Sequence, residues 1–263
     1  MFWKKLTTFA AGAVAISMAL SAPAFADLKD ILSAGKVRIA VPENFPPFGS
    51  LGAEGEYVGY DVDVAKMVAE DLGVELELVP VTSKQRIPFL ETSKVDLVIS
   101  TLGANPERAK SIWFSSAYAP FFSGAFAKAD VTVSSVKDFA GKTIAVTGGS
   151  LEDLAITADA PADANIVRFG DNAATIAAYV SGQADVIVTG NIVALGIIND
   201  HPDFNLEKKF IIANSPCFVG VKTGELDLLQ WVNVFVLNKK LNGKLNGLSE
   251  KWLKMPLADL PTL

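Results

Sequence analysis

Hydrophobic positions along the chain follow two alternating patterns. Short apolar runs, typical of buried strands, occur at 37–41, 74–81, 95–100, 141–146, 165–169, 184–190 and 217–222. Apolar residues at helical spacing predict helices at 60–73, 86–92, 151–159, 172–182, 225–241 and 245–253. This alternation predicts an α/β fold with mostly parallel sheets flanked by helices.

The strand-and-helix pattern starts a second time near the middle of the chain. The first set closes near Tyr118, a further strand spans 121–130, and the second set runs to about Ile212. Two sets of this size predict two lobes. Ligands on open α/β sheets bind beyond the carboxyl ends of the strands. Polar or glycine-containing segments follow three such ends, at 101–108, 147–153 and 190–191, so we expect a cleft between the lobes.

The first 26 residues have the pattern of a cleaved secretory signal peptide. Lys4 and Lys5 precede an apolar run from Leu6 to Leu20, and the run is followed by Ala-Phe-Ala at 24–26. A membrane anchor is the alternative, but this run is shorter than the roughly 20 residues that span a bilayer. We therefore expect export to the periplasm with cleavage before Asp27.

Charge and cysteine content exclude several classes of function. The first 26 residues hold two lysines and no acids, so the remaining chain has 21 basic and 29 acidic residues and a net charge of −8. This acidic balance argues against binding to nucleic acid or to an anionic membrane surface. Cys217 is the only cysteine, so no internal disulfide can form.

Four stretches resemble a known family. They are VPENFPPF (41–48), GYDVDVAKMVAEDLG (59–73), RIPFLETSKVDLVISTLGANPERAKSIWFSSAY (86–118) and GKTIAVTGGSLEDL (141–154). On these motifs the chain resembles the periplasmic solute-binding proteins of polar-amino-acid ABC importers, the bacterial extracellular solute-binding protein family 3. The resemblance extends over nearly the whole chain after the signal peptide.

The resemblance implies a two-lobed periplasmic-binding-protein fold of type II. Lobe 1 would comprise 27–121 plus 214–263, and lobe 2 would comprise 122–213, with two hinge crossings near 120–124 and 210–215. Such a protein closes on one small solute and delivers it to a membrane ABC permease. No cofactor or metal is expected. The protein is expected to be a monomer.

The resemblance also implies roles for particular residues. Arg108 would hold the carboxylate of the solute, since its planar guanidinium can donate two parallel hydrogen bonds. The NPER sequence (105–108) is expected to start a helix, whose first turn disfavours a cation unless the cation has a function. Thr101 and Gly103 would assist through a hydroxyl and a backbone N–H, and the aromatic rings of Phe45 and Tyr60 would enclose the solute side chain.

The chain departs from the family pattern where the ammonium of an amino acid is usually held. The aspartate that usually follows the strand matching 184–189 is replaced by Gly190, with Asn191 next to it as a candidate ligand contact. Glu152 can substitute as the acid, although a glutamate in a first helical turn is also favoured by the helix dipole alone. Glu43 is a weaker candidate. A carboxylate solute without an amino group would equally suit Arg108 and the helix N-terminus at Ser150.

Three functions remain open at this point. The first is a binding protein that closes on a carboxylate-bearing solute, an amino acid or a derivative, for an importer. The second is a dehydratase-like periplasmic enzyme on the same scaffold, although His201 and Cys217 have no evident catalytic partner. The third is a sensor that docks on a membrane signalling partner when closed.

Overall fold

The computed structural model describes residues 27–261 of the chain. The predicted signal peptide, residues 1–26, lies outside the described residues. Over the described range, the helices are all too short or too polar to cross a membrane.

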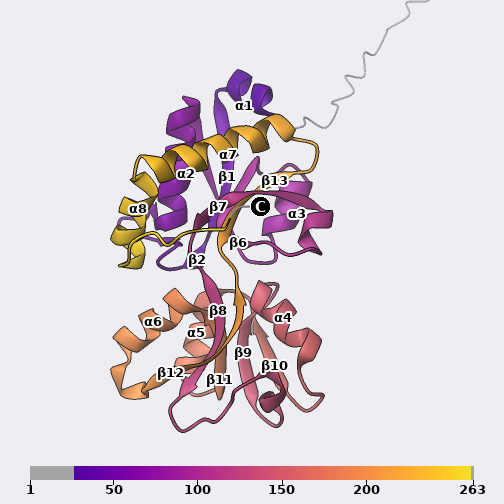
Figure 1. Ribbon diagram of the computed structural model, residues 1–263, viewed down its shortest axis with the longest axis vertical. Coiled ribbons are helices and arrows are strands. Elements are labelled where there is room, and N and C mark those ends of the chain that lie inside the picture. Colours follow the sequence, from indigo (N-terminus) through magenta and orange to yellow (C-terminus); the bar gives the residue numbers. More distant parts are fainter. Residues whose placement is uncertain (1–26, 262–263) are drawn as a thin grey trace, which may run out of the picture.

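One five-stranded sheet has the strand order β5-β1-β6-β13-β7 (Figure 1). Its strands are β1 (Lys36–Pro42), β5 (Glu75–Val81), β6 (Leu97–Gly103), β7 (Ile112–Ala119) and β13 (Cys217–Lys222). Its helices are α1 (Leu28–Ala34), α2 (Tyr60–Leu72), α3 (Arg86–Glu91), α7 (Leu226–Leu241) and α8 (Lys244–Leu248), which a π-helical turn (Ser249–Leu253) follows. A small sheet beside it holds β2 (Asn44–Phe45), β3 (Gly49–Leu51) and β4 (Tyr57–Val58). We call these elements the first lobe.

The second five-stranded sheet has the order β10-β9-β11-β8-β12. Its strands are β8 (Phe122–Lys128), β9 (Thr143–Thr147), β10 (Asn165–Phe169), β11 (Val186–Gly190) and β12 (Leu206–Asn214). Its helices are α4 (Leu151–Asp159), α5 (Asn172–Val180) and α6 (Asn191–Asp200), and short 3-10 turns lie at Val136–Phe139 and Pro202–Phe204. We call these elements the second lobe.

Both sheets are mixed, which refines the predicted fold class. In the first sheet β1 runs parallel to β5 and β6, whereas β13 runs antiparallel to β6 and β7. In the second, β9 runs parallel to β10 and β11, whereas β8 is antiparallel to β11 and β12. The antiparallel strands are those that enter or leave the crossings between lobes. The two-lobed α/β class is confirmed, and the strands of the crossings are the reason that the sheets are not mostly parallel.

Apolar side chains cover both faces of each sheet. In the first lobe, Val64, Val68 and Leu72 lie on one side of α2 and are buried in a cluster with Ile39 and Leu97 of the sheet. A second cluster covers the opposite face, and two further clusters fill the second lobe. Each sheet is therefore a rigid platform with its strand ends at one edge.

Two chain segments connect the lobes, and they lie side by side. One leads from β7 to β8 and the other from β12 to β13 (Figure 1). The amide of Ser215 in one crossing donates a 3.0 Å hydrogen bond to the carbonyl of Phe121 in the other. These crossings place the strand ends of the two sheets opposite one another.

Candidate functional site

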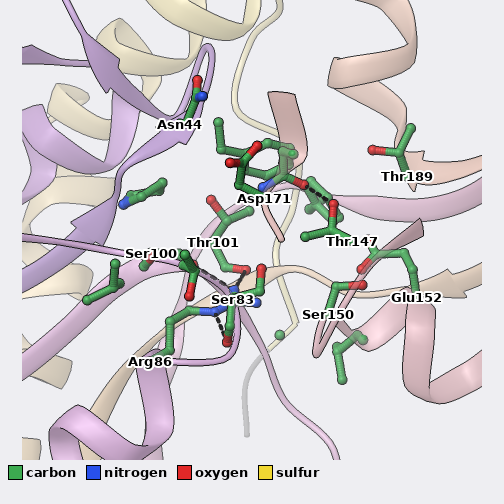
Figure 2. Close-up of a pocket in the computed structure, with 18 of the residues that line it drawn as sticks. Asn44, Ser83, Arg86, Ser100, Thr101, Thr147, Ser150, Glu152, Asp171 and Thr189 are labelled. Atoms are coloured by element: carbon green, nitrogen blue, oxygen red, sulfur yellow. Dashed lines mark hydrogen bonds between the residues drawn. The ribbon is translucent and has the colours of Figure 1, made fainter. Parts of the chain in front are cut away.

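The two lobes enclose a cleft lined by polar groups from both sides (Figure 2). The first lobe and the crossings contribute Pro42, Glu43, Asn44, Phe45, Val81, Thr82, Ser83, Arg86, Ser100, Thr101, Gly103, Arg108, Phe121 and Ser215. The second lobe contributes Thr147, Ser150, Leu151, Glu152, Asp171, Asn172, Val188 and Thr189. The volume open to the centre of a water molecule is about 40 Å³. One water needs roughly 10–15 Å³ by this measure, so the cleft in this closed arrangement suits a compact solute.

Arg108 lies in the cleft and reaches from one lobe to the other. Its Nη1 donates to the carbonyl of Gly103 at 2.9 Å, and its Nη2 donates to the carbonyl of Gly149 at 3.1 Å. The residue begins a 3-10 turn (Arg108–Lys110), not an α-helix, so the expected conflict with a helix dipole does not occur here. Burial first, and then the positive charge of Arg86, lower the pKa of Arg108 to about 9. The guanidinium is therefore charged at neutral pH, but little negative charge lies near it to balance this positive charge.

Arg86 is a second buried arginine that the sequence analysis missed. It is the first residue of α3 and is 6% exposed. Its Nε donates to the carbonyl of Ser83 at 3.2 Å, and its Nη1 donates to the carbonyls of Ser100 at 2.8 Å and Thr101 at 3.0 Å. Burial lowers its pKa. A cation in the first turn of an apolar helix is the signal that could have identified it.

Thr101 lines the cleft with its backbone and turns its hydroxyl away. Its Oγ1 donates to Oδ2 of Asp61 at 2.7 Å, which corrects the expectation of a hydroxyl contact with the solute. Thr101 has a φ of +47°, a strained value for a β-branched residue. The bond to Asp61 and the bond from Arg86 hold the residue in this conformation, which directs its carbonyl to the guanidinium.

Asp61 is completely buried beneath the cleft. Its carboxylate accepts hydrogen bonds from Thr101 and, at 2.7 Å, from the hydroxyl of Tyr118. Burial raises the pKa of Asp61 to about 7, although these two bonds act in the opposite direction. The local sequence does not mark this carboxylate as part of a site, because an aspartate in the first turn of a helix is common for reasons of the helix dipole alone.

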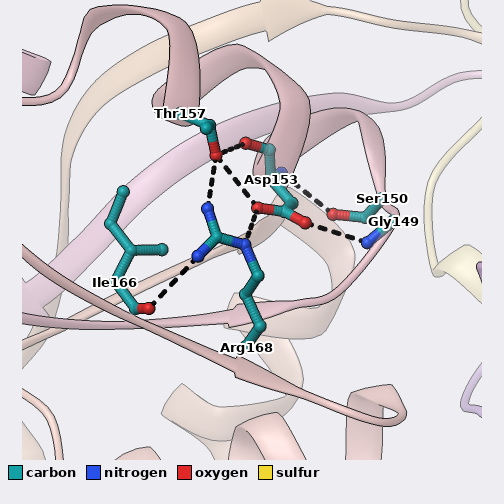
Figure 3. A network of polar contacts seen from close by, with 6 residues as sticks. All are labelled: Gly149, Ser150, Asp153, Thr157, Ile166 and Arg168. Carbon is teal, nitrogen blue, oxygen red and sulfur yellow. Dashed lines mark hydrogen bonds and ion pairs between the residues drawn. The ribbon is translucent and has the colours of Figure 1, made fainter.

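A network around Asp153 fixes the turn that precedes α4 (Figure 3). One carboxylate oxygen accepts from the amide of Gly149 at 2.9 Å, and the other accepts from Nε of Arg168 at 2.7 Å. The amide of Asp153 in turn donates to the hydroxyl of Ser150, the N-cap of the helix. Ser150 lines the cleft, and the network holds the Gly149 carbonyl that accepts from Arg108.

Glu152 is buried at the wall of the second lobe and faces the cleft. It is 8% exposed, and its Oε1 accepts from the hydroxyl of Ser123 at 2.8 Å. Figure 2 shows it across the cleft from Arg86 and Thr101. Asp171 also lines the cleft, but its Oδ1 caps α5 by accepting from the amide of Ala174 at 2.8 Å. Glu152 is thus the more deeply buried of these two acids.

The two aromatic rings expected in the cleft have different positions. Phe45 lines the cleft and stacks on Phe48 with ring centroids 5.5 Å apart. Tyr60 is fully buried in the core, where its hydroxyl donates to the carbonyl of Tyr118 at 2.9 Å. Tyr60 does not line the cleft, which corrects that expectation: as the first residue of α2 it faces the sheet.

Phe121 packs against Gly190, the position at which the family resemblance predicts an aspartate. A Cβ added to Gly190 would lie 2.1 Å from Cζ of Phe121, so a side chain at position 190 is sterically blocked. Asn191 is not among the residues that line the cleft, because its Oδ1 accepts from the amide of Phe122 at 3.2 Å. The expected contact of Asn191 with a solute is therefore corrected, and the residue instead ties α6 to β8.

Metal chemistry would need a cluster of ligands, and nucleophilic chemistry would need a reactive group such as the thiol of Cys217. Within residues 27–261, no cluster of three or more His, Cys, Asp or Glu side chains could hold a metal ion. Cys217 is buried in β13, and burial raises the pKa of its thiol well above the usual value. Such a thiol remains protonated and unreactive at neutral pH.

Comparison with known proteins gives consistent matches. The family model of bacterial extracellular solute-binding proteins, family 3, matches residues 37–255. The ABC transporter glutamine-binding protein GlnH of Bacillus subtilis (strain 168) is 30% identical over 211 residues, which are 79% of this chain and 77% of that protein. The structure of an ancestral arginine-binding protein bound to arginine aligns with a TM-score of 0.77 at 29% identity, and covers 83% of this chain and 98% of that one.

An enzyme is also among the relatives. The cyclohexadienyl dehydratase of Pseudomonas aeruginosa is 29% identical over 185 residues, which are 67% of each chain. The family model nevertheless spans almost all of the described residues. The chain belongs to the bacterial extracellular solute-binding proteins, family 3.

Proposed function

We propose that this protein is the periplasmic substrate-binding component of an ABC importer and that it binds an amino acid or a close derivative in the cleft. The likeness to a glutamine-binding protein of an ABC transporter supports this role. The N-terminal pattern of a signal peptide supports export. Its partners are then a small solute and a membrane permease, and it works as a monomer.

The observation that carries the proposal is the position of Arg108. A buried guanidinium at the junction of both lobes donates only to uncharged carbonyls, and it has donor capacity left for an anion. The α-carboxylate of the solute takes this position in our proposal, next to Gly103 and the helix N-terminus at Ser150. Glu152 then binds the ammonium group, because position 190, where the family pattern predicts an aspartate, is a glycine. Phe45 packs against the solute side chain.

Solute binding and lobe closure are coupled in this scheme. Arg108 belongs to the first lobe, whereas Ser150 and Glu152 belong to the second. A solute that contacts both lobes binds the closed arrangement more tightly than the open one, so it shifts the population toward closure. The closed form is the one that an importer would recognise.

Replacement of Arg108 tests the proposal. A thermal-shift screen against amino acids, organic acids and amines identifies the solute, because a hundredfold excess over Kd adds about 2.7 kcal/mol to the apparent stability. Arg108→Ala should then weaken binding by about 3–5 kcal/mol in titration calorimetry, since it leaves a carboxylate buried without a partner. Arg108→Lys keeps the positive charge but cannot donate two parallel hydrogen bonds. Its affinity for the solute should lie between those of the unmodified protein and Arg108→Ala. Nearly unchanged affinity in both variants would remove Arg108 from the site.

Catalysis is the second candidate because one relative is a dehydratase and because Glu43 and Glu152 both line the cleft. We propose that no reaction occurs, since the closely matching relatives are binding proteins and Cys217 is buried. Prolonged incubation with the identified solute should return it unchanged. A new product in mass spectrometry, lost in Glu152→Gln, would favour the enzyme.

A further inference from the structure

Arg86 has hydrogen-bond donors left over on the side of the cleft. A guanidinium carries five N–H groups. The single hydrogen of Nε and both hydrogens of Nη1 are used by the carbonyls of Ser83, Ser100 and Thr101. Nη2 donates to none of the described residues. Arg86 lines the cleft, and the two hydrogens of Nη2 remain for a ligand.

The charge of Arg86 has no carboxylate in direct contact in the described part of the chain. No carboxylate there lies within 4 Å of Arg86 or of Arg108. Glu152 and Asp61 act on Arg86 only from a greater distance, and Asp61 lies beneath Thr101, where two hydroxyl groups donate to it. Among the residues that line the cleft, two buried cations therefore face one deeply buried acid, Glu152.

A singly charged carboxylate solute leaves this imbalance in place. If Arg108 takes the α-carboxylate and Glu152 the ammonium, a neutral amino acid adds no net charge, and Arg86 still has no anionic group in direct contact. Glu43 and Asp171 also line the cleft, but both are only half-buried, so solvent screens their charges more strongly. Leaving a buried cation unpaired is costly, so a second anionic group on the solute is favoured.

The spacing of the two arginines suits a short dicarboxylic solute. Arg86 donates to the carbonyl of Thr101, and Arg108 donates to the carbonyl of Gly103. Two residues of strand advance by about 7 Å, a distance that a chain of a few carbon atoms spans. The small volume of the cleft agrees with a compact solute.

We propose that the solute of this protein carries a second carboxylate, and that Nη2 of Arg86 holds it while Arg108 holds the first. This inference rests on the proposed function in the cleft and narrows its substrate class to acidic amino acids of the size of aspartate or glutamate. Arg86 is then the residue that determines specificity for the acid over its amide.

Pairs of solutes that differ only in the second carboxylate test the proposal without any mutation. The protein, expressed with its own N-terminal segment and purified, is titrated calorimetrically at neutral pH with L-glutamate and L-glutamine and with L-aspartate and L-asparagine. At least one acid should bind about 100-fold more tightly than its amide, because an amide cannot neutralise Arg86. Equal or tighter binding of both amides would overturn the proposal.

Substitution of Arg86 identifies the group responsible. Arg86→Gln should weaken binding of the acid by about 100-fold and change binding of the amide by only a fewfold. Arg86→Lys keeps a charge at the site and should retain part of the preference, even where Arg86→Gln fails to fold. Thermal melting of each variant without solute checks its fold. An undiminished acid preference in Arg86→Gln, or in Arg86→Lys where only that variant folds, would contradict the role of Arg86.

Glutarate separates this inference from the amino-acid function itself. If glutarate binds through Arg86 whereas none of the amino acids binds, the site for the second carboxylate is supported and the amino-acid function is contradicted. If the amides bind as tightly as the acids and their binding depends on Arg108, the amino-acid function is supported and the site for a second carboxylate is contradicted. If none of the dicarboxylic compounds binds, the proposal is wrong.

Discussion

At the scale of single residues, the site is built from buried charges that carbonyl and hydroxyl groups hold in place. Arg86 and Arg108 donate to backbone carbonyls, and Asp61 accepts from hydroxyls. Such hydrogen bonds fix the geometry of a charge but repay only part of its desolvation cost. The site therefore keeps its charges oriented and poorly neutralised, which is the condition in which a solute ion of opposite charge gains most.

Asp61 provides a prediction about pH. Its carboxyl group has a pKa of about 7 in the folded protein against 3.8 as the ordinary value. Between these values the folded state keeps a proton that the unfolded state has released, so the contribution of Asp61 to the free energy of unfolding falls as the pH rises from about 4 to 7. The asparagine side chain in Asp61→Asn cannot ionise, so the stability of that variant lacks this pH dependence.

Urea denaturation of both proteins across this range checks the sign. The stability of the unmodified protein minus that of Asp61→Asn should decrease with rising pH, by an amount on the order of a few kcal/mol, and should level off above pH 7. A difference that is constant with pH, or that increases, would show that the buried carboxyl group does not titrate as described.

At the scale of elements, the start of α6 is closely packed around Gly190. The Phe121 ring lies on Gly190, and it also packs against Phe45 and Phe48 with centroid distances of 6.4 Å and 5.8 Å. A side chain at position 190 would require this aromatic group to shift. In our proposal the acid for an ammonium group therefore comes from another element, as Glu152 of α4.

A pair of glycine substitutions, one at the N-cap of α6 and one within the helix, tests this packing. Gly190→Ala should destabilise the protein by about 1–3 kcal/mol through overpacking, because its Cβ would lie 2.1 Å from the Phe121 ring. Gly196→Ala is the control, since a Cβ there meets nothing within 4 Å and alanine favours a helix by up to about 1 kcal/mol. Similar thermal shifts for the two variants would contradict the packing.

At the scale of the whole molecule, direct contacts join the two lobes across the cleft. Arg108 of the first lobe bonds to Gly149 of the second, and Lys84 packs against Gly148 and Gly149. The two crossings are the covalent connections between the lobes, and in the proposed function they act as the hinge. With these contacts formed, the cleft is closed, and a solute bound there would be enclosed.

A reversible cross-link tests whether this closed form controls solute exchange. A Cβ on Gly149 would lie 3.5 Å from Cβ of Lys84, within the usual range for a disulfide. The oxidised double variant Lys84→Cys with Gly149→Cys should take up no added solute in calorimetry, and reductant should restore binding. Gly149→Cys alone controls for the left-handed backbone at that position, which has a φ of +78°. Equal binding in the oxidised and reduced forms would show that the lobes need not open here.

Several elements of the fold follow directly from local sequence patterns. The periodicity of 60–73 with Gly73 at its end predicts α2, and Gly73 has the left-handed φ of 68° that ends the helix. The apolar runs predict β1, β9 and β11 to within a few residues. Elements without a clear local pattern were missed, including α6 and β12, and the expected helix at Arg108 is only a 3-10 turn.

The sequence by itself determined the two-lobed α/β class, the family, and the presence of Arg108, Ser150 and Glu152 near strand ends, because periodicity and short motifs are local properties of the chain. Only the tertiary structure decided which side chains face the cleft. It buries Tyr60, turns the hydroxyl of Thr101 to Asp61, and brings Arg86 beside Arg108. These outcomes depend on contacts between residues far apart in the sequence, where steric fit and hydrogen-bond partners are set by packing and leave no periodic trace.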